Sequence, residues 1–170
     1  MISAELIETR LSQQFIPSEQ TGNYEFHYSA LLEWFQCVGR NWTPNKVMLG
    51  CLAVYGWMPR ILEVRKAPER CLSNRAAENV AFRLNSGVID IDPPFVNESV
   101  VGTSKFLHFW NPQEFPIWDS RVRRTLLRDA PLGDPIEEYN SYRAAMKQAA
   151  TRLQRDLRDI EYHLFQVGLV

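Results

Sequence analysis

The most informative segment of the sequence is VGTSKFLHFWNPQEFPIWDSRVRR, residues 101–124. Its first half is apolar and aromatic and predicts a short helix over 104–110. Two prolines bracket the segment Pro112–Pro116, which therefore cannot continue that helix. Asp119 stands where a second helix is expected to begin, because a carboxylate at this position can accept bonds from the first free amides. The stretch thus predicts two helices joined by a turn.

Outside this stretch, apolar residues recur at helical spacing over 28–38, 48–55, 72–84, 139–153 and 157–167. Thr43-Pro44 is typical of a helix start, and Asn85-Ser86-Gly87 of a helix end. Val88–Asp92 alternates apolar and acidic side chains but runs into two prolines, so we expect an extended connection there rather than a strand. The sequence therefore predicts an all-α fold. We expect a single helical domain over residues 1–170, with seven or eight helices and a helix-hairpin-helix-like element.

Composition excludes several classes of protein. With 45% hydrophobic and 23% charged residues, the chain resembles an ordinary globular domain and not a disordered one. We expect no membrane span and no secretory signal, because long apolar runs are absent from the sequence. The cysteines have no metal-binding spacing, and we expect reduced, buried thiols in a cytoplasmic protein; they are Cys37, Cys51 and Cys71.

The formal net charge of -1 is the sum of unevenly charged stretches. Residues 58–83 and residues 105–128 each carry a net charge of +3. On one face of the protein, two such stretches would form a phosphate-binding surface. The alternative is that these charges only cover solvated helix faces.

Lys105 and Asp119 are the candidate catalytic residues. A helix over 104–110 advances only ~10 Å, whereas the connection 111–118 can reach ~26 Å when extended. The chain can therefore return and bring both predicted helix N-termini to one cleft. A desolvated lysine can act as an amine nucleophile at a sugar carbon, and a carboxylate can stabilise positive charge on the sugar. The alternatives are a solvated lysine in a first helical turn and an aspartate that is only an N-cap.

Two sequence elements within 98–128 resemble a known family. Gly102-Thr103-Ser104-Lys105, followed by Pro116-Ile117-Trp118-Asp119, is similar to the core of helix-hairpin-helix DNA glycosylases, and most of all to the 8-oxoguanine DNA glycosylase branch and its small bacterial relatives. The resemblance implies an all-helical fold, Lys105 as a Schiff-base nucleophile and Asp119 as the catalytic carboxylate. It implies that Gly102 belongs to a hairpin that grips DNA, and that no metal or organic cofactor is needed. The family hairpin carries an earlier glycine where this chain has Val100.

Other residues near these elements are candidates for contacts with DNA. The resemblance extends to the hydroxyl residues Thr103 and Ser104. Arg121 and Arg124 are candidates for phosphate contacts, although arginines here, Arg123 included, can instead pair with local acids such as Asp119 or Glu114. Tyr55 and Trp57 are candidates for stacking on an extruded base, and their alternative is packing in the core.

The sequence thus leads to one hypothesis and one alternative. The first is a DNA glycosylase, with lyase activity as an option, that flips a modified base out of DNA and excises it through a lysine Schiff base. Its partner would be DNA, not a membrane. The alternative is a non-catalytic DNA-binding or protein-interaction domain on the same fold, suggested by Val100 and by the near-neutral total charge.

Overall fold

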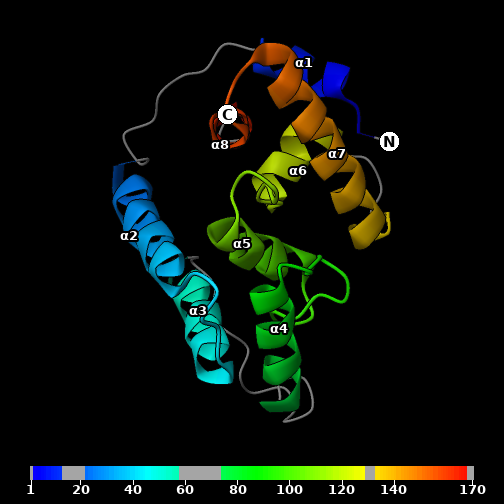
Figure 1. Ribbon diagram of the computed structural model, residues 1–170. Coiled ribbons are helices and arrows are strands. Elements are labelled where there is room, and N and C mark those ends of the chain that lie inside the picture. Colours follow the sequence, from blue (N-terminus) through cyan, green and yellow to red (C-terminus); the bar gives the residue numbers. More distant parts are fainter. Residues whose placement is uncertain (1, 13–21, 58–73, 129–132, 168–170) are drawn as a thin grey trace. The chain divides into compact units, whose positions relative to one another are not determined.

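The computed structural model describes residues 2–12, 22–57, 74–128 and 133–167. Within these ranges the chain forms eight helices and no strand, which confirms the predicted all-α fold (Figure 1). The helices are α1 (Ala4–Leu11), α2 (Gly22–Val38), α3 (Pro44–Trp57), α4 (Asn74–Ser86), α5 (Val100–Trp110), α6 (Ser120–Leu127), α7 (Pro135–Leu153) and α8 (Leu157–Val167).

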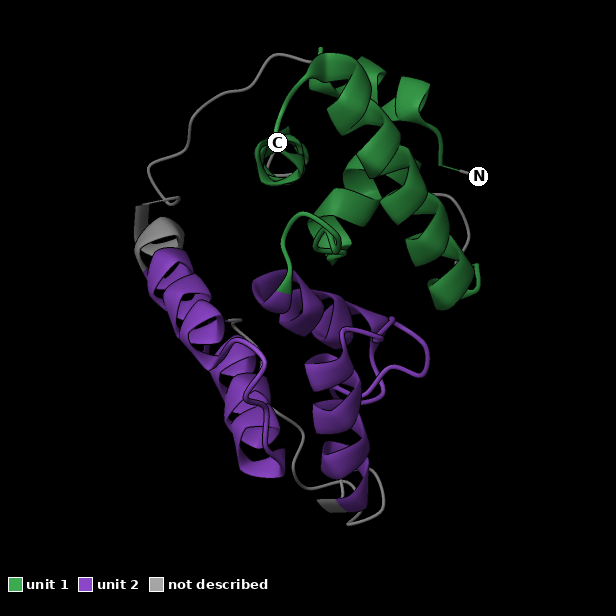
Figure 2. Cartoon of the chain, in the orientation of Figure 1, with its two compact units in different colours: residues 1–19, 111–170 green, residues 20–110 purple. Residues whose placement is uncertain are grey.

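The chain divides into two compact units, which Figure 2 distinguishes by colour. Unit 2 comprises residues 20–110 and holds α2 to α5. Unit 1 comprises residues 1–19 and 111–170 and holds α1, α6, α7 and α8. That the two units make one domain stays a prediction.

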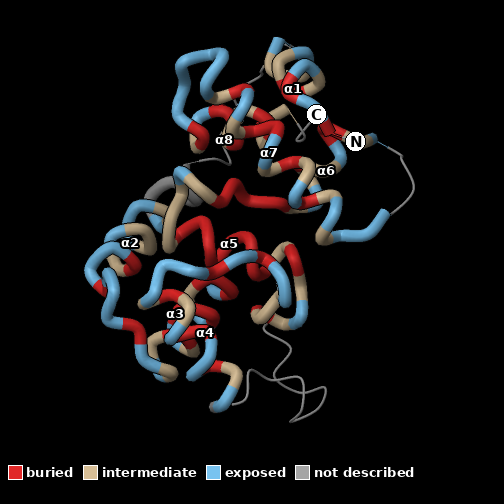
Figure 3. Tube along the Cα trace, turned by 45° about the vertical axis from the view of Figure 1, so that its right-hand side comes forward, coloured by how far each residue is buried: buried red, intermediate tan, exposed pale blue. Residues whose placement is uncertain are grey.

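Helix α5 is the core of unit 2. Helices α2 and α3 both pack against it, and α4 packs against α3. Nine of the eleven residues of α5 are buried, so the helix appears in Figure 3 as an almost continuous buried run. The Phe106 ring lies 5.0 Å from the Phe35 ring and 5.4 Å from the Trp42 ring. The apolar first half of the 101–124 stretch therefore forms an interior helix.

The predicted start of α3 and the predicted end of α4 are confirmed. The Thr43 hydroxyl accepts a hydrogen bond from the Lys46 amide at 3.3 Å, directly before the first helical residue of α3. Gly87 ends α4 with a φ of 72°, a left-handed conformation that glycine adopts at little cost. Asn85 exchanges two hydrogen bonds with the backbone of Trp42, at 2.8 and 2.9 Å, and so ties the end of α4 to the α2–α3 connection.

The predicted start of α5 is wrong by four residues. The helix begins at Val100, and Ser99 caps it by accepting a hydrogen bond from the Gly102 amide at 3.3 Å. Gly102 lies inside the helix. A side chain is excluded there, because a Cβ would stand 2.9 Å from the Val96 carbonyl oxygen. Its glycine character thus serves close packing rather than the end of a connection. Lys105 is consequently in the second turn of the helix and not at its N-terminus.

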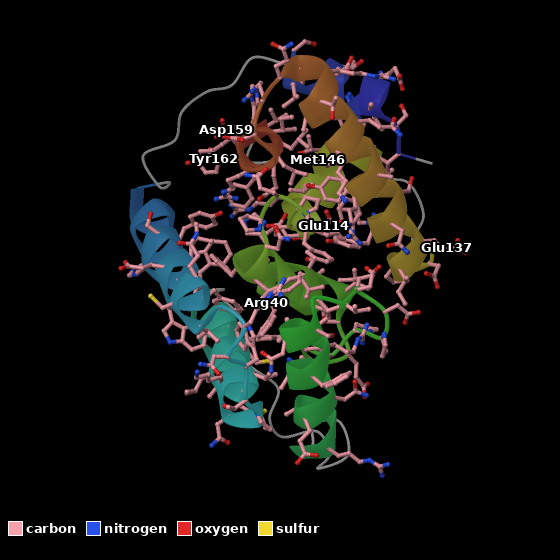
Figure 4. The ribbon with its side chains drawn as sticks, in the orientation of Figure 1. Arg40, Glu114, Glu137, Met146, Asp159 and Tyr162 are labelled. Carbon is pink, nitrogen blue, oxygen red and sulfur yellow. The ribbon has the colours of Figure 1, made fainter. Side chains whose placement is uncertain are left out.

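Unit 1 is built around α8, which packs against α1, α6 and α7. The Thr125 hydroxyl of α6 donates to the Leu164 carbonyl of α8 at 3.0 Å. Val122 and Leu126 of α6 are buried and contribute to the core of unit 1. The largest fully buried side chains of this unit are Ile7, Phe115, Tyr139, Tyr142, Met146, Ile160 and Leu164, of which Figure 4 labels Met146.

The cysteines differ from one another. Cys51 is buried in α3 as predicted, and burial raises the pKa of its thiol to about 12. Cys37 is exposed, contrary to the prediction, because it lies on the side of α2 away from the buried Phe35 and Val38. Both of these thiols are free, and Cys71 lies outside the described residues.

None of the described helices is long and apolar enough to cross a membrane.

Candidate active-site residues

Lys105 is buried in α5, with only 8% of its surface exposed. Its ammonium nitrogen lies 5.6 Å from the centroid of the Trp57 ring, within the range of a cation–π interaction. The neighbouring polar residues on the same helix, Ser104 and His108, are fully buried. The alternative of a solvated lysine in a first helical turn is therefore wrong on both counts.

Three rings, which we call the aromatic wall, gather beside Lys105; they are Tyr28, Trp57 and Phe109. The Trp57 and Phe109 rings meet edge to face at 5.3 Å, and the Tyr28 ring lies 5.2 Å from Phe109 and 6.3 Å from Trp57. Phe109 is fully buried, whereas Tyr28 and Trp57 are half-buried. The wall thus has an apolar base and a partly exposed edge.

The three predicted hairpin residues are buried in the first turns of α5. The Thr103 hydroxyl accepts hydrogen bonds from the amides of Phe95 and Val96, at 2.9 and 3.0 Å, and so fixes the turn before the helix. The Ser104 hydroxyl donates to the Val101 carbonyl at 2.9 Å. These contacts give both hydroxyls a structural role. A contact of Gly102, Thr103 or Ser104 with DNA stays a prediction.

The two predicted stacking residues differ in their surroundings. Tyr55 is 8% exposed and belongs to the core of unit 2. Its hydroxyl would lie 3.0 Å from a Cβ at Gly102, so it packs against the start of α5. Trp57 lies at the end of α3 and forms part of the aromatic wall. Stacking on a base stays a prediction for both residues.

Asp119 is the N-cap of α6, as the sequence predicts. Its Oδ1 accepts hydrogen bonds from the amides of Arg121 and Val122, at 3.0 and 2.9 Å. Both bonds end on Oδ1, and no hydrogen bond within the described residues ends on Oδ2. The carboxylate is therefore fixed in direction by one oxygen, while the other keeps its capacity to interact with further groups.

The segment that carries Asp119 is held by two tyrosines of α7. The Tyr139 hydroxyl donates to the Pro116 carbonyl at 3.3 Å, and the Tyr142 hydroxyl to the Ile117 carbonyl at 3.2 Å. The Trp118 ring lies 4.7 Å from the Tyr142 ring. Complete burial raises the pKa of Tyr142, and the nearby charge of Glu161 adds to this effect, so the hydroxyl stays a donor.

The sequence alone does not indicate this supporting role of Tyr139 and Tyr142. Their place in the α7 pattern marks them only as buried. The available signal was their chemical type, since a buried tyrosine hydroxyl usually needs a hydrogen-bond partner. Nothing in the sequence indicates that these partners are the carbonyls just before Asp119.

The arginines of α6 have different environments. The Arg121 guanidinium lies 4.8 Å from the Phe165 ring, and Arg124 is exposed. Arg123 pairs with Glu138 at 2.9 Å. Glu114, labelled in Figure 4, instead pairs with Arg143 and Lys147 of α7. Phosphate contacts by Arg121 and Arg124 stay a prediction.

The candidate residues are distributed over both units. Unit 2 holds Lys105 with the aromatic wall, and unit 1 holds Asp119 with Arg121 and Arg124. The meeting of Lys105 and Asp119 in one cleft stays a prediction. Among the described residues, no group of three or more histidine, cysteine or acidic side chains is arranged to hold a metal ion.

No known protein family, curated protein or solved structure matches the chain. The similarity to helix-hairpin-helix glycosylases therefore rests on the motif residues alone, and what the structure establishes is the all-α fold.

Proposed function

We propose that the protein is a DNA glycosylase with lyase activity, in which Lys105 is the nucleophile and Asp119 the assisting carboxylate. The substrate class is DNA that contains a modified base. The Lys105 amine forms a bond to C1′ of the nucleotide as the glycosidic bond breaks. The base leaves with the electron pair of that bond and takes up a proton. After proton loss from nitrogen and opening of the sugar ring, the product is an imine between lysine and sugar.

The observation that carries this proposal is the burial of Lys105. Lysine is among the residues least often buried, because taking its charge out of water is costly. A lysine that is 8% exposed, on an apolar helix and against a tryptophan ring, is unusual for a structural role. Such surroundings are typical of amine nucleophiles, which react in their uncharged form.

Asp119 supports the proposal through its rigidity. A carboxylate that stabilises a developing sugar cation must be oriented before the reaction begins. The N-cap bonds to Oδ1 provide this orientation, and the pinned segment 116–118 holds the backbone behind it. The same residue can therefore be both a cap and a catalytic group.

Borohydride trapping tests the proposal. The wild-type protein and the variants Lys105→Gln and Lys46→Gln are incubated with duplex oligonucleotides that carry an oxidised purine, an alkylated purine or an abasic site. Borohydride reduces any imine to a stable covalent adduct. Lys46 is the matched control, because it lies in the same unit on α3 and its amine donates to the Asn41 carbonyl at 2.8 Å.

We expect an adduct with wild type and with Lys46→Gln, and none with Lys105→Gln. Only four lysines occur in the chain, so peptide mass spectrometry assigns the modified residue directly. Absence of an adduct with wild-type protein, or an equal yield with Lys105→Gln, would contradict the proposed reaction.

A second candidate function is DNA binding without catalysis. It is favoured by Val100, which stands where the family hairpin has a glycine and which is 7% exposed as the first residue of α5. A salt titration of oligonucleotide binding separates the two functions. Binding without base release supports the DNA-binding module, and absence of binding at ~50 mM salt favours a protein-interaction domain.

A further inference from the structure

A hydrogen bond between Tyr28 and His108 joins α2 to α5. The Tyr28 hydroxyl oxygen lies 2.8 Å from Nε2 of His108. His108 is fully buried, so the bond is made in surroundings where losing either partner is costly. The two residues are 80 positions apart in the sequence, and the bond therefore fixes a tertiary relationship rather than a local one.

The same two residues lie next to the candidate nucleophile. Lys105, His108 and Phe109 are spaced i, i+3 and i+4 on α5 and so share one face of the helix. The Tyr28 ring contacts His108 at 5.7 Å and Phe109 at 5.2 Å. Tyr28 thus packs along the face of α5 from which Lys105 projects.

Trp57 connects this contact to the lysine amine. Its ring lies 6.3 Å from the Tyr28 ring, 5.3 Å from the Phe109 ring and 5.6 Å from the Lys105 ammonium. Trp57 is the last residue of α3, and helix ends fray unless other contacts hold them. The rings of Tyr28 and Phe109 supply those contacts.

We propose that Tyr28 and His108 are positioning residues that hold the aromatic wall against Lys105 and thereby fix the direction of its amine. This inference rests on the proposed function, in which that amine attacks C1′. A lysine has a flexible four-carbon stem, and its reaction rate depends on how many of its conformers aim the nitrogen correctly. When the amine loses its proton the cation–π attraction disappears, and packing against the wall still limits the conformers of the lysine stem.

Three variants separate the hydrogen bond from the packing. Tyr28→Phe removes only the hydroxyl and keeps the ring. His108→Leu removes the bonding partner, whereas His108→Gln keeps a side chain that can either donate to or accept from the tyrosine. His108→Gln is therefore the conservative variant that should restore the effect.

The first measurement needs no DNA. Each protein is treated with a small amine-reactive reagent, and modification of Lys105 is followed by mass spectrometry with Lys46 as the internal reference. Labelling of Cys51 by a thiol reagent is followed in parallel, because this buried cysteine of the same unit reports any general opening of unit 2. A merely structural role would raise both labelling rates together.

We expect Lys105 labelling to rise about tenfold in Tyr28→Phe and His108→Leu, with Cys51 labelling unchanged, and to stay within about twofold of wild type in His108→Gln. In single-turnover trapping, the adduct should form about tenfold more slowly in the first two variants. Unchanged Lys105 labelling in Tyr28→Phe, or a parallel rise of Lys105 and Cys51, overturns the inference.

The two proposals fail in different ways. A wild-type protein that forms no adduct overturns the proposed function, while the labelling result still decides whether Tyr28 and His108 hold the amine. If wild type forms the adduct and Tyr28→Phe forms it equally fast, the positioning role is overturned and the proposed function stays intact.

Discussion

The hydroxyl of Tyr142 donates a hydrogen bond of 3.2 Å to the carbonyl oxygen of Ile117. Ile117 lies two residues before Asp119. Tyr142 and Ile117 are both almost completely buried. Because a buried carbonyl without a donor is costly, this bond ties the position of the Asp119 backbone to the packing of α7.

We predict that Tyr142→Phe lowers the free energy of unfolding by about 1–2 kcal/mol, since the Ile117 carbonyl loses its donor while the ring remains. Urea denaturation measures this. The control is Tyr162→Phe on α8, labelled in Figure 4 and half-buried, which should change stability by no more than about 0.5 kcal/mol. Equal effects of the two substitutions would contradict the role given to Tyr142.

Substitutions of Asp119 separate its cap from its charge. Asp119→Ala should cost about 1 kcal/mol of stability, whereas asparagine caps helices as well as aspartate does and should cost little. In the proposed function, Asp119→Asn should nevertheless lower the rate of adduct formation by about a hundredfold, a typical loss for one stabilising group.

Asp134 offers the matched control for Asp119. It caps α7 in the same way, with Oδ1 accepting from the amides of Ile136 and Glu137, both at 2.9 Å. Asp134→Asn should leave both stability and adduct formation unchanged. If Asp119→Asn trapped as fast as wild type, Asp119 would be a cap and nothing more.

Gly102 and Gly56 should respond in opposite directions to replacement by alanine. A Cβ at Gly102 would stand 2.9 Å from the Val96 carbonyl oxygen, which is backbone and cannot easily move, so Gly102→Ala should destabilise by about 1–3 kcal/mol. A Cβ at Gly56 meets nothing within 4 Å, and alanine should stabilise α3 there by about 0.5–1 kcal/mol. Thermal unfolding of both variants checks the pair.

The Arg123–Glu138 pair should make stability depend on acid pH. The hydrogen bond from Arg123 is the main reason that the pKa of Glu138 lies below its ordinary value of 4.5. The carboxylate therefore stabilises the folded protein above pH 4.5, and this contribution is lost as the pH falls through the lower folded pKa. Because both side chains are partly exposed, with 18% and 17% of their surfaces accessible, we expect only about 1 kcal/mol.

Unfolding of Glu138→Gln over a pH series measures this contribution. The variant should be less stable than wild type at pH 7, and the difference should shrink as wild-type Glu138 becomes protonated. Glu137→Gln is the control, because Glu137 is exposed and extends away from α7 in Figure 4. A difference between Glu138→Gln and wild type that stays constant with pH would show that the ion pair is not its cause.

The sequence predicts those features of the fold that depend on residues close together in the chain, namely helices, helix boundaries and a cap. The apolar period predicts α2, α3, α4, α7 and α8 but not α1, Thr43 and Gly87 mark two boundaries, and Asp119 is a predicted cap, because each of these features depends on residues within a few turns of helix. Gly102 leads to a wrong helix start, because its missing side chain makes room for the Val96 carbonyl in the turn before α5 and does not end the preceding connection. A single sequence does not distinguish these two reasons for a glycine.

The contacts around the candidate residues could not be predicted from the sequence, because they join residues far apart in the chain. The Tyr28–His108 bond spans 80 residues, and the tyrosines that hold the segment before Asp119 lie 23 and 25 residues downstream of their partners. Arg123 finds Glu138, 15 residues away, although nearer acids were the obvious choice. Such pairings depend on how helices cross, which the periodic pattern of each helix does not specify.

The insertion of unit 2 between α1 and α6 has a consequence for synthesis on the ribosome. Every partner of α2 to α5 within unit 2 has been made once residue 110 is translated. By contrast, α1 packs against α6, α7 and α8, and the Ile2 amide donates to the Ser141 hydroxyl, which is translated 139 residues later. During synthesis α1 therefore remains without these unit 1 partners until α6, α7 and α8 have been translated, and in that interval its apolar face is open to chaperones or to misassembly.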